Sequence, residues 1–178
     1  MPEIEGDLDS FAADPRRYAP LKRFRCGTGE SRPEREVDKM TREYAKGTRR
    51  ADLFRVTVEQ PTRLVGLAAF QPAAFSQPVL AQVNGYPYIS LIGVSREFRG
   101  RKKAGVRPGD VVLLDALRTI NSHGQWGVAP DIFALVDPNN GPSCALFQRH
   151  GFEVVIAADP SNPEADSLLG RQGKAVAG

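Results

Sequence analysis

The chain has 178 residues, of which 41% are hydrophobic and 25% are charged, and its formal net charge is +3 at pH 7. A chain of this length can bury a core of its own, and this composition excludes a disordered, collagen-like or coiled-coil protein. The net charge is too small to indicate a polyanionic partner by itself.

No stretch of the sequence approaches the ~20 apolar residues that a membrane-spanning helix needs. Residues 1–14 are acidic, whereas a secretory signal begins with basic residues, so we expect a cytoplasmic protein without membrane contact. Cys26 and Cys144 lack the spacing of a redox pair or a zinc site, and we expect two reduced thiols and no bound metal.

The first third of the chain carries mixed signals. Residues 1–20 contain three prolines among acidic residues, which predicts a loosely ordered lead-in with one short helix near residues 8–13. Residues 21–25 alternate apolar and basic side chains, as a partly exposed first strand does. Apolar residues at helical spacing between Pro33 and Gly47 then predict an amphipathic helix.

Three strands are predicted next. Residues 53–59 and 64–70 are rich in strand-forming side chains, and the short connection at 60–62 indicates an antiparallel hairpin. The proline-rich stretch 72–87 predicts a long loop, of a length that is usually functional or mobile. Residues 88–94 are strongly apolar, as expected of a central strand covered on both faces.

The second half alternates helices and strands. Asp110 is placed to cap a helix over residues 111–120, whose leucines recur at helical spacing. Residues 157–178 are rich in small and polar residues and predict a flexible tail, so a single domain is expected over residues 21–156. The remaining predicted elements are a strand at 132–136, a helix at 143–150 and a strand at 152–156.

A basic loop connects the central strand to the following helix. Residues 95–107 hold six basic side chains against Glu97 alone, and the loop Arg99–Asp110 leads into a helix amino terminus. Free backbone N–H groups and the positive end of the helix dipole suit a phosphate group. The sequence therefore offers a pyrophosphate site, although a solvated surface turn has the same pattern.

Two motifs resemble the GNAT (Gcn5-related N-acetyltransferase) superfamily. Residues 140–152, Asn-Gly-Pro-Ser-Cys-Ala-Leu-Phe-Gln-Arg-His-Gly-Phe, resemble its carboxy-terminal motif, and residues 89–100 resemble its central strand and the entry to its acetyl-CoA loop. Together the motifs and their connection cover residues 88–156, and the hairpin at 53–70 fits the preceding part of the fold.

The resemblance implies an α/β (α+β) GNAT fold, in which a mixed, mostly antiparallel central sheet is flanked by helices and splayed where acetyl-CoA binds. The pantetheine arm would pair with the central strand, and backbone amides from Arg99 to the helix start would hold the pyrophosphate. The cofactor-binding residues implied are Ile92, Gly93, Val94, Arg99, Gly100, Arg101, Lys102, Lys103, Ala104, Gly105, Gly109, Asp110, Asn140 and Ser143.

The loop departs from the family pattern. Lys102 stands at the central glycine position, and five additional residues, Gly105–Gly109, precede the helix. Either Lys102, Lys103 and Arg107 compensate with side-chain charge, or the loop no longer grips CoA well.

The catalytic residues depart as well. Phe147 replaces the tyrosine that protonates the departing thiolate in many relatives, so Ser143 or water would have to supply this proton. The Val94 N–H would polarise the thioester carbonyl. Asp137 is the first candidate for the general base, with Glu59 and Tyr88 behind it. Structural roles compete for several of these residues: Asn140 as a helix cap, and Gly151 and Phe152 as a helix stop and a core aromatic.

The predicted function is direct transfer of the acetyl group of acetyl-CoA to a primary amine. One alternative is a non-catalytic acyl-CoA-binding or interaction module that keeps the fold. Another is an aminoacyl-tRNA acceptor, because residues 24–27 and the helix ending at Gly47 are similar to the start of GNAT toxins. A third is simple nucleic-acid binding through residues 96–107. Relatives often pair through sheet edges, which leaves a homodimer open.

Overall fold

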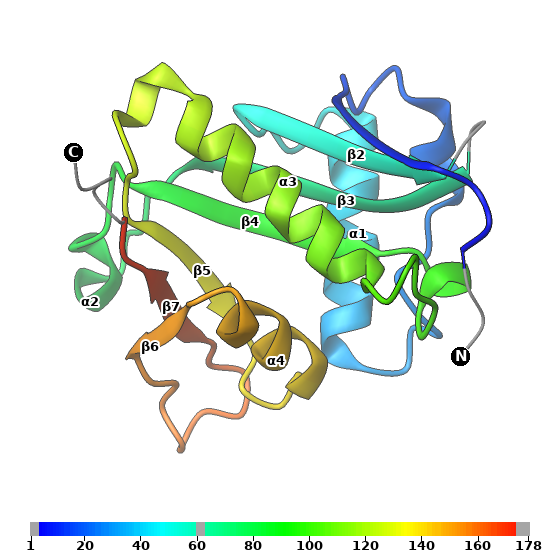
Figure 1. Ribbon diagram of the computed structural model, residues 1–178. Helices are drawn as coiled ribbons and strands as arrows, with labels where there is room; N and C mark the ends of the chain where they lie inside the picture. Colours follow the sequence, from blue (N-terminus) through cyan, green and yellow to red (C-terminus); the bar gives the residue numbers. More distant parts are fainter. Residues whose placement is uncertain (1–3, 60–62, 174–178) are drawn as a thin grey trace. The chain divides into compact units, whose positions relative to one another are not determined.

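The computed structural model describes residues 4–59 and 63–173 (Figure 1). Within them, seven strands form one sheet in the order β1-β2-β3-β4-β5-β7-β6, accompanied by four α-helices and three short 3₁₀ helices. The elements are β1 (Leu8–Ala12), η1 (Ala19–Arg23), α1 (Arg32–Lys46), β2 (Leu53–Glu59), β3 (Arg63–Pro72), α2 (Pro78–Ala81), β4 (Pro87–Val94), η2 (Arg96–Phe98), α3 (Pro108–Ser122), η3 (Gly124–Trp126), β5 (Ile132–Val136), α4 (Gly141–Arg149), β6 (Glu153–Ile156) and β7 (Ser167–Arg171).

The chain divides into two compact units. Met1–Phe70 and Leu91–Leu117 make up the first, and Gln71–Ser90 and Arg118–Gly178 make up the second. The strand β4 passes from the second unit into the first at Leu91. The single domain predicted for residues 21–156 stays a prediction.

The first unit contains an antiparallel sheet between two helices. β1 pairs with β2 from Leu8↔Glu59 to Ala12↔Arg55, and β2 pairs with β3, with an irregularity at Thr57/Val58. The helices α1 and α3 lie on opposite faces of these strands (Figure 1). The hairpin predicted over residues 53–70 is confirmed by this pairing, while its connection at 60–62 lies outside the described residues.

Sequence signals at both ends explain α1. Its N-cap is Ser31, whose Oγ accepts a hydrogen bond from the Glu34 N–H at 3.4 Å, and Pro33 lies in the first turn. The helix ends at Gly47 in the left-handed conformation. Its apolar face packs into the core, where the Tyr44 and Phe54 rings lie 5.3 Å apart, so the predicted amphipathic helix is confirmed.

A close approach seats α3 against the sheet. A Cβ at Gly66 on β3 would lie 2.5 Å from Val112 Cγ2 and 2.8 Å from the Gly93 carbonyl oxygen. Arg55 on β2 donates two hydrogen bonds to the carboxylate of Asp115 on α3, at 2.8 Å each, and both side chains are more than four-fifths buried. These contacts fix the distance and the rotation of the helix.

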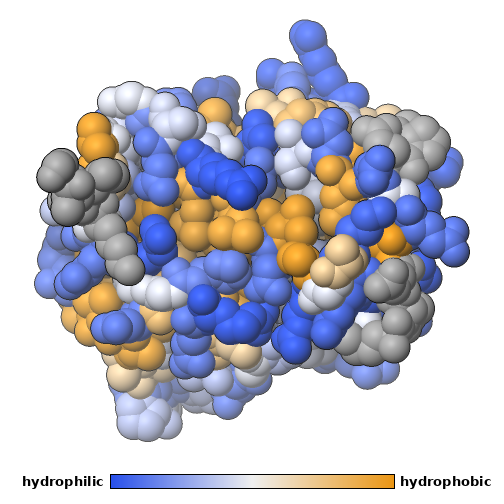
Figure 2. Space-filling view, in the orientation of Figure 1, coloured by the Kyte–Doolittle hydropathy of each residue, from blue (hydrophilic) through white to orange (hydrophobic). Residues whose placement is uncertain are grey.

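The second unit contains the rest of the sheet. β4 pairs in parallel with β5 through Tyr88↔Phe133 and Ile89↔Ala134, which makes the sheet mixed. β7 lies antiparallel between β5 and β6, and Val154 and Val155 of the edge strand β6 are half exposed. Apolar atoms gather at the lower left of Figure 2, on the side where Figure 1 draws β6. The mixed, mostly antiparallel sheet flanked by helices is therefore confirmed.

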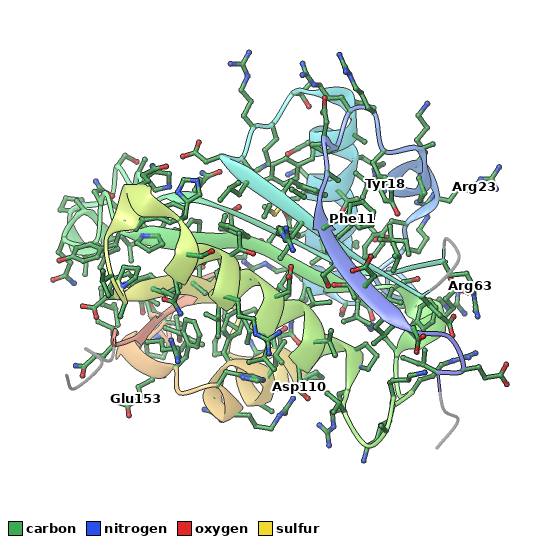
Figure 3. All side chains as sticks on the ribbon, turned by 45° about the horizontal axis from the view of Figure 1, so that its top comes forward. Phe11, Tyr18, Arg23, Arg63, Asp110 and Glu153 are labelled. Atoms are coloured by element: carbon green, nitrogen blue, oxygen red, sulfur yellow. The ribbon has the colours of Figure 1, made fainter. Side chains whose placement is uncertain are left out.

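Two elements near the amino terminus correct the sequence-based predictions. Leu8–Ala12 is a strand and not a short helix, because β2 offers an edge for pairing, and Phe11 packs edge-on against Tyr18 at 5.9 Å (Figure 3). Residues 21–25 do not form a strand. The 3₁₀ helix η1 begins at Ala19, has Pro20 in its first turn and ends at Arg23.

Three further predictions were incomplete or wrong. The flexible tail predicted for residues 157–178 contains β7, whose ladders with β5 and β6 hold it in the sheet. The loop predicted for residues 72–87 includes the four-residue helix α2. The helix predicted over residues 111–120 begins earlier, at Pro108, which has no N–H to leave unpaired at the first helical position.

The buried Arg55–Asp115 pair gives a stability prediction. We expect Arg55→Ala to lower the free energy of unfolding by about 1–3 kcal/mol, because it leaves a largely buried carboxylate without its partner. Arg49→Ala removes a more exposed pair with Glu43 and is the matched control, with an expected loss below about 1 kcal/mol. Urea unfolding of both variants measures the difference. Equal losses would contradict a special role of the Arg55 pair in seating α3.

Candidate functional site

The basic loop after β4 folds into a tight hairpin. Lys103 and Val106 exchange two backbone hydrogen bonds of 2.9 Å, and both residues between them have positive φ, 47° at Ala104 and 81° at Gly105. Two central residues of this kind characterise a type I′ turn, for which glycine is favoured and alanine is not. Of the five additional residues predicted to precede the helix, Gly105 and Val106 thus belong to this turn, whereas Pro108 and Gly109 lie in α3 itself.

The amino terminus of α3 is the second part of the site. Pro108 and Gly109 open the helix, and the Arg107 carbonyl accepts hydrogen bonds from Asp110 N–H at 3.0 Å and Val111 N–H at 3.3 Å. Asp110 therefore lies inside the first turn (labelled in Figure 3) and is not the N-cap that the sequence predicted. The Asp110 carboxylate interacts favourably with the helix dipole, but it repels an anion bound at the same place.

The segment has the positive charge that suits a pyrophosphate, but several of the backbone N–H groups predicted to hold it are already bonded. Those of Arg99, Arg101 and Lys103 donate to the carbonyls of residues 96, 98 and 106. The loop and first turn, residues 99–110, hold five basic side chains against the one carboxylate of Asp110. A fifteen-residue helix directs its amino terminus to the same place, where Gly109 has no side chain to obstruct an anion. These residues all belong to the first unit, as do Ile92, Gly93 and Val94 in the second half of β4.

The Arg99 side chain is engaged within the protein. Its guanidinium pairs with the Glu34 carboxylate of α1 and donates to the Cys26 sulfur at 3.2 Å. Arg99 thereby ties the loop to the segment before α1. Its backbone N–H, which was predicted to help hold phosphate, donates to the Arg96 carbonyl at 3.3 Å. Sequence reasoning missed this contact, since Glu34 and Arg99 are 65 positions apart.

Glu34 is the centre of a small network. Its Oε2 accepts hydrogen bonds from Gly29 N–H at 3.2 Å and Thr28 Oγ1 at 3.4 Å. Desolvation acts to raise the pKa of Glu34, but hydrogen bonding and charge from Arg99 outweigh it, and the pKa lies below its ordinary value. Glu34 stays ionised at neutral pH and holds Arg99 in place.

The amino-terminal segment contacts the loop from another side. The Lys103 ammonium donates to the Glu5 carbonyl at 3.1 Å and lies 3.6 Å from the Asp7 carboxylate, and Ile4 N–H donates to the Lys102 carbonyl at 2.7 Å. Ile4 is buried with Val65 and Phe98 in a satellite of the core. Of the two predicted phosphate-binding lysines, Lys103 is thus already paired, whereas Lys102 makes no ion pair with any described residue.

The end of β4 faces the segment that precedes α1. Arg96 N–H donates to the Arg25 carbonyl at 2.7 Å, which brings Cys26 beside Val94. Burial raises the pKa of the Cys26 thiol, against the opposing effects of Arg99 and of a backbone hydrogen bond from Val94. In this structure the N–H predicted to polarise a thioester carbonyl is directed at a protonated, buried thiol.

The carboxy-terminal motif lies in the second unit and is built around α4. Asn140 caps the helix, because its Oδ1 accepts a hydrogen bond from Ser143 N–H at 3.3 Å, as the structural alternative for this residue predicts. Asp137 follows β5 and accepts a hydrogen bond from Asn139 N–H at 2.9 Å. Phe147 is buried edge-on against Phe152 at 4.9 Å, which is a core contact.

The other candidate bases have structural contacts. Glu59 is buried on β2, accepts a hydrogen bond from Gly6 N–H at 2.8 Å and pairs with Arg63 at 2.9 Å, so it ties the segment before β1 to the start of β3. Tyr88 packs edge-on against Phe75 at 5.0 Å in the second unit. The structure thus places Asp137, Asn140 and Ser143 close together along the chain in one unit and Glu59 in the other.

In residues 4–59 and 63–173, no three His, Cys, Asp or Glu side chains gather in a way that could hold a metal ion. None of the helices described has the length and apolar character required to cross a bilayer. Cys26 and Cys144 are both free thiols, as predicted.

Comparisons with solved structures identify the fold. No protein-family model and no curated protein sequence matches the chain. A bacterial toxin superposes with a TM-score of 0.66 at 18% identity, covering 94% of this chain and 92% of its own. PaiA N-acetyltransferase from Thermoplasma acidophilum, in complex with coenzyme A, gives a TM-score of 0.62 at 14% identity, with 93% and 99% covered. The GNAT family N-acetyltransferase YhbS from Escherichia coli, in complex with CoA, gives 0.53 at 20% identity, with 98% and 84% covered.

The Glu34–Arg99 pair predicts a pH dependence of stability. A folded-state pKa below the ordinary value means that the pair stabilises the protein above the unfolded-state pKa and that this is lost as the pH falls through the folded-state pKa. We expect Glu34→Gln to be less stable than the wild type at pH 7, and the difference to shrink between about pH 5 and pH 3.

Urea midpoints over this pH range are the measurement. Glu36→Gln, which removes an exposed carboxylate from the same helix, is the matched control and should change the midpoint little at any pH. If Glu34→Gln and Glu36→Gln follow the same curve, Arg99 is not held by Glu34.

Proposed function

Because this chain has the fold of the GNAT N-acetyltransferases, we propose that it binds acetyl-CoA and transfers the acetyl group to an amine. The observation that carries the proposal is the basic loop that runs directly into the amino terminus of α3. The positive charge of the loop and the positive end of the helix dipole meet there, and both suit a pyrophosphate. The CoA complexes of PaiA and YhbS support the choice of ligand.

The proposed binding mode uses the chain's own backbone and cations. Gly109 offers its N–H group to the pyrophosphate, since Pro108 has none and the Asp110 N–H donates to the Arg107 carbonyl. Lys102 and Arg107 add charge at the same end of the helix. Arg101 lies 5.8 Å from the Phe98 ring centroid, a contact that keeps its guanidinium beside the loop. The backbone of Ile92, Gly93 and Val94 is the proposed partner of the pantetheine arm.

The proposed reaction is a direct transfer. The neutral amine nitrogen attacks the thioester carbonyl carbon, the C–S bond breaks, the amine loses a proton and the CoA thiolate gains one. Asp137 is our candidate for accepting the amine proton, and the Ser143 hydroxyl is our candidate for protonating the thiolate, since Phe147 has no proton to give. The Val94 N–H is the proposed donor to the carbonyl oxygen.

A non-catalytic acyl-CoA-binding module is the second candidate. It is favoured by the burial of Phe147 at the usual position of the acid and by the contact between Val94 and the Cys26 thiol. Such a module would bind acetyl-CoA without releasing CoA in the presence of amines. Protein-dependent CoA release would exclude it.

An aminoacyl-tRNA acceptor is favoured by a different observation, the similarity of the fold to that of a bacterial toxin. The exposed cations Arg16, Arg17, Lys22 and Arg23 in the first unit would then contact phosphates. Transfer to aminoacyl-tRNA that falls steeply with salt is the result expected of this version.

Isothermal titration with acetyl-CoA tests the proposed binding. We expect saturable binding that is weakened about tenfold or more, or ~1.4 kcal/mol, by Lys102→Ala with Lys103→Ala, because both cations lie on the loop. Lys22→Ala with Arg23→Ala removes the same charge from the exposed η1 and is the matched control. Failure of the folded wild type to bind acetyl-CoA would overturn the proposed function.

A further inference from the structure

The second unit contains a cavity that the proposed acetyl-CoA site does not use. Its volume is about 640 Å³, within the range of pockets for small molecules. One wall comes from α2 and the loop before it, the floor from the ends of β5 and β6, and the other wall from residues 157–166 between β6 and β7. All of its lining residues belong to the second unit.

The floor of the cavity is apolar. Leu135 and Ile156 lie at the edge of a small core of the second unit, and Phe75 is held there by Tyr88. Asn84 clamps the loop that carries Phe75, since its Oδ1 accepts from Phe75 N–H at 2.6 Å and its Nδ2 donates to the Phe75 carbonyl at 3.1 Å. An alkyl chain therefore has an ordered apolar surface on which to lie.

The wall opposite α2 is acidic. Asp159, Glu164 and Asp166 all line the cavity, and its lining residues, every one of which the structure describes, include no lysine, arginine or histidine. Three carboxylates around an apolar floor favour a cation and disfavour a phosphate group.

Two successive turns order the acidic wall. Asp159 Oδ1 accepts hydrogen bonds from the Ser161 hydroxyl at 2.7 Å and the Ser161 N–H at 2.8 Å, and these bonds lower the pKa of Asp159. Asn162 Oδ1 accepts a hydrogen bond from Glu164 N–H at 3.0 Å, which forms the next turn. The carboxylates are thus presented by a folded segment.

The cavity adjoins the candidate base of the same unit. Val136 on β5 pairs with Ser167 on β7. Asp137 is the residue after Val136 and Asp166 the residue before Ser167, so both lie at the same end of this antiparallel ladder. Leu135, which lines the floor, is two residues from Asp137 along β5. Asp137 does not itself line the cavity, so a ligand has to extend past Leu135 toward the end of β5 to meet it.

We propose that this cavity binds an alkylamine carrying more than one positive charge and that this amine is the acceptor, a role that rests on the proposed acetyl transfer. The attacking nitrogen must be neutral. The carboxylates of the acidic wall therefore pair with a second nitrogen of the amine, which stays a charged ammonium group. The apolar floor holds the alkyl chain between the two nitrogens. Asp137 takes the proton from the attacking one.

Titration with a matched pair of amines tests the binding. We expect 1,5-diaminopentane to bind about tenfold or more tightly than 1-aminopentane at low salt without acetyl-CoA, because the chains are equal and only the second charge differs. Glu164→Lys should abolish this preference. Glu153→Lys makes the same change on β6 outside the cavity, where Glu153 points outward in Figure 3, and should leave the preference intact.

Two results would overturn the proposal: equal binding of both amines by the wild type, or an undiminished preference in Glu164→Lys. Acetyl-CoA titration of the same proteins tests the proposed function separately, and neither variant should change the affinity for acetyl-CoA.

The acceptor role is tested by kinetics. Glu164→Lys should raise the KM for 1,5-diaminopentane about tenfold with little change in kcat. Transfer to aminoacyl-tRNA that Glu164→Lys leaves unchanged would contradict the proposed acceptor while keeping the acetyltransferase.

Discussion

The close approach of α3 to the sheet is the constraint on which the proposed acetyl-CoA site depends. Gly66 permits it, because any side chain there would meet Val112 and the Gly93 carbonyl. The Arg55–Asp115 pair then fixes the rotation of the helix over β2. Since Gly109 belongs to the first turn of the same helix, the place that would receive phosphate is set by packing in the body of the first unit rather than by the loop alone.

The loop itself is restrained by charge. Arg99 pairs with Glu34, and Lys103 with the Glu5 carbonyl and Asp7, so two of its five cations already lie beside a carboxylate of the protein. These contacts give the loop an ordered shape even though Lys102 replaces the glycine expected at its centre. They also neutralise part of the positive charge of the loop. The charge that remains to attract a ligand is therefore smaller than the composition of residues 95–107 suggests.

Local patterns in the sequence predicted much of the fold but less of the candidate site. The strands β2, β4 and β5 and the helix α1 carry their own periodicity and caps, and they lie within two residues of where they were predicted. The strands β1 and β7 were not predicted because each depends on pairing with an edge supplied by distant residues. For the same reason the sequence did not disclose that Glu34 holds Arg99. The acidic wall could have been recognised in the sequence, because residues 159–166 contain three carboxylates. It was missed because these residues belong to a segment that was predicted to be a flexible tail.

The two units carry opposite charge at the places proposed to bind ligands. A basic loop in the first unit suits the phosphates of a donor, and an acidic cavity in the second suits a cationic acceptor. The net charge of +3 averages over this separation and indicates neither partner. A polyanionic acceptor would be attracted by the first unit and repelled by the cavity, whereas a diamine would be drawn to the carboxylates of the second. The segment between β6 and β7, rather than the overall charge, is therefore what favours a small cationic amine.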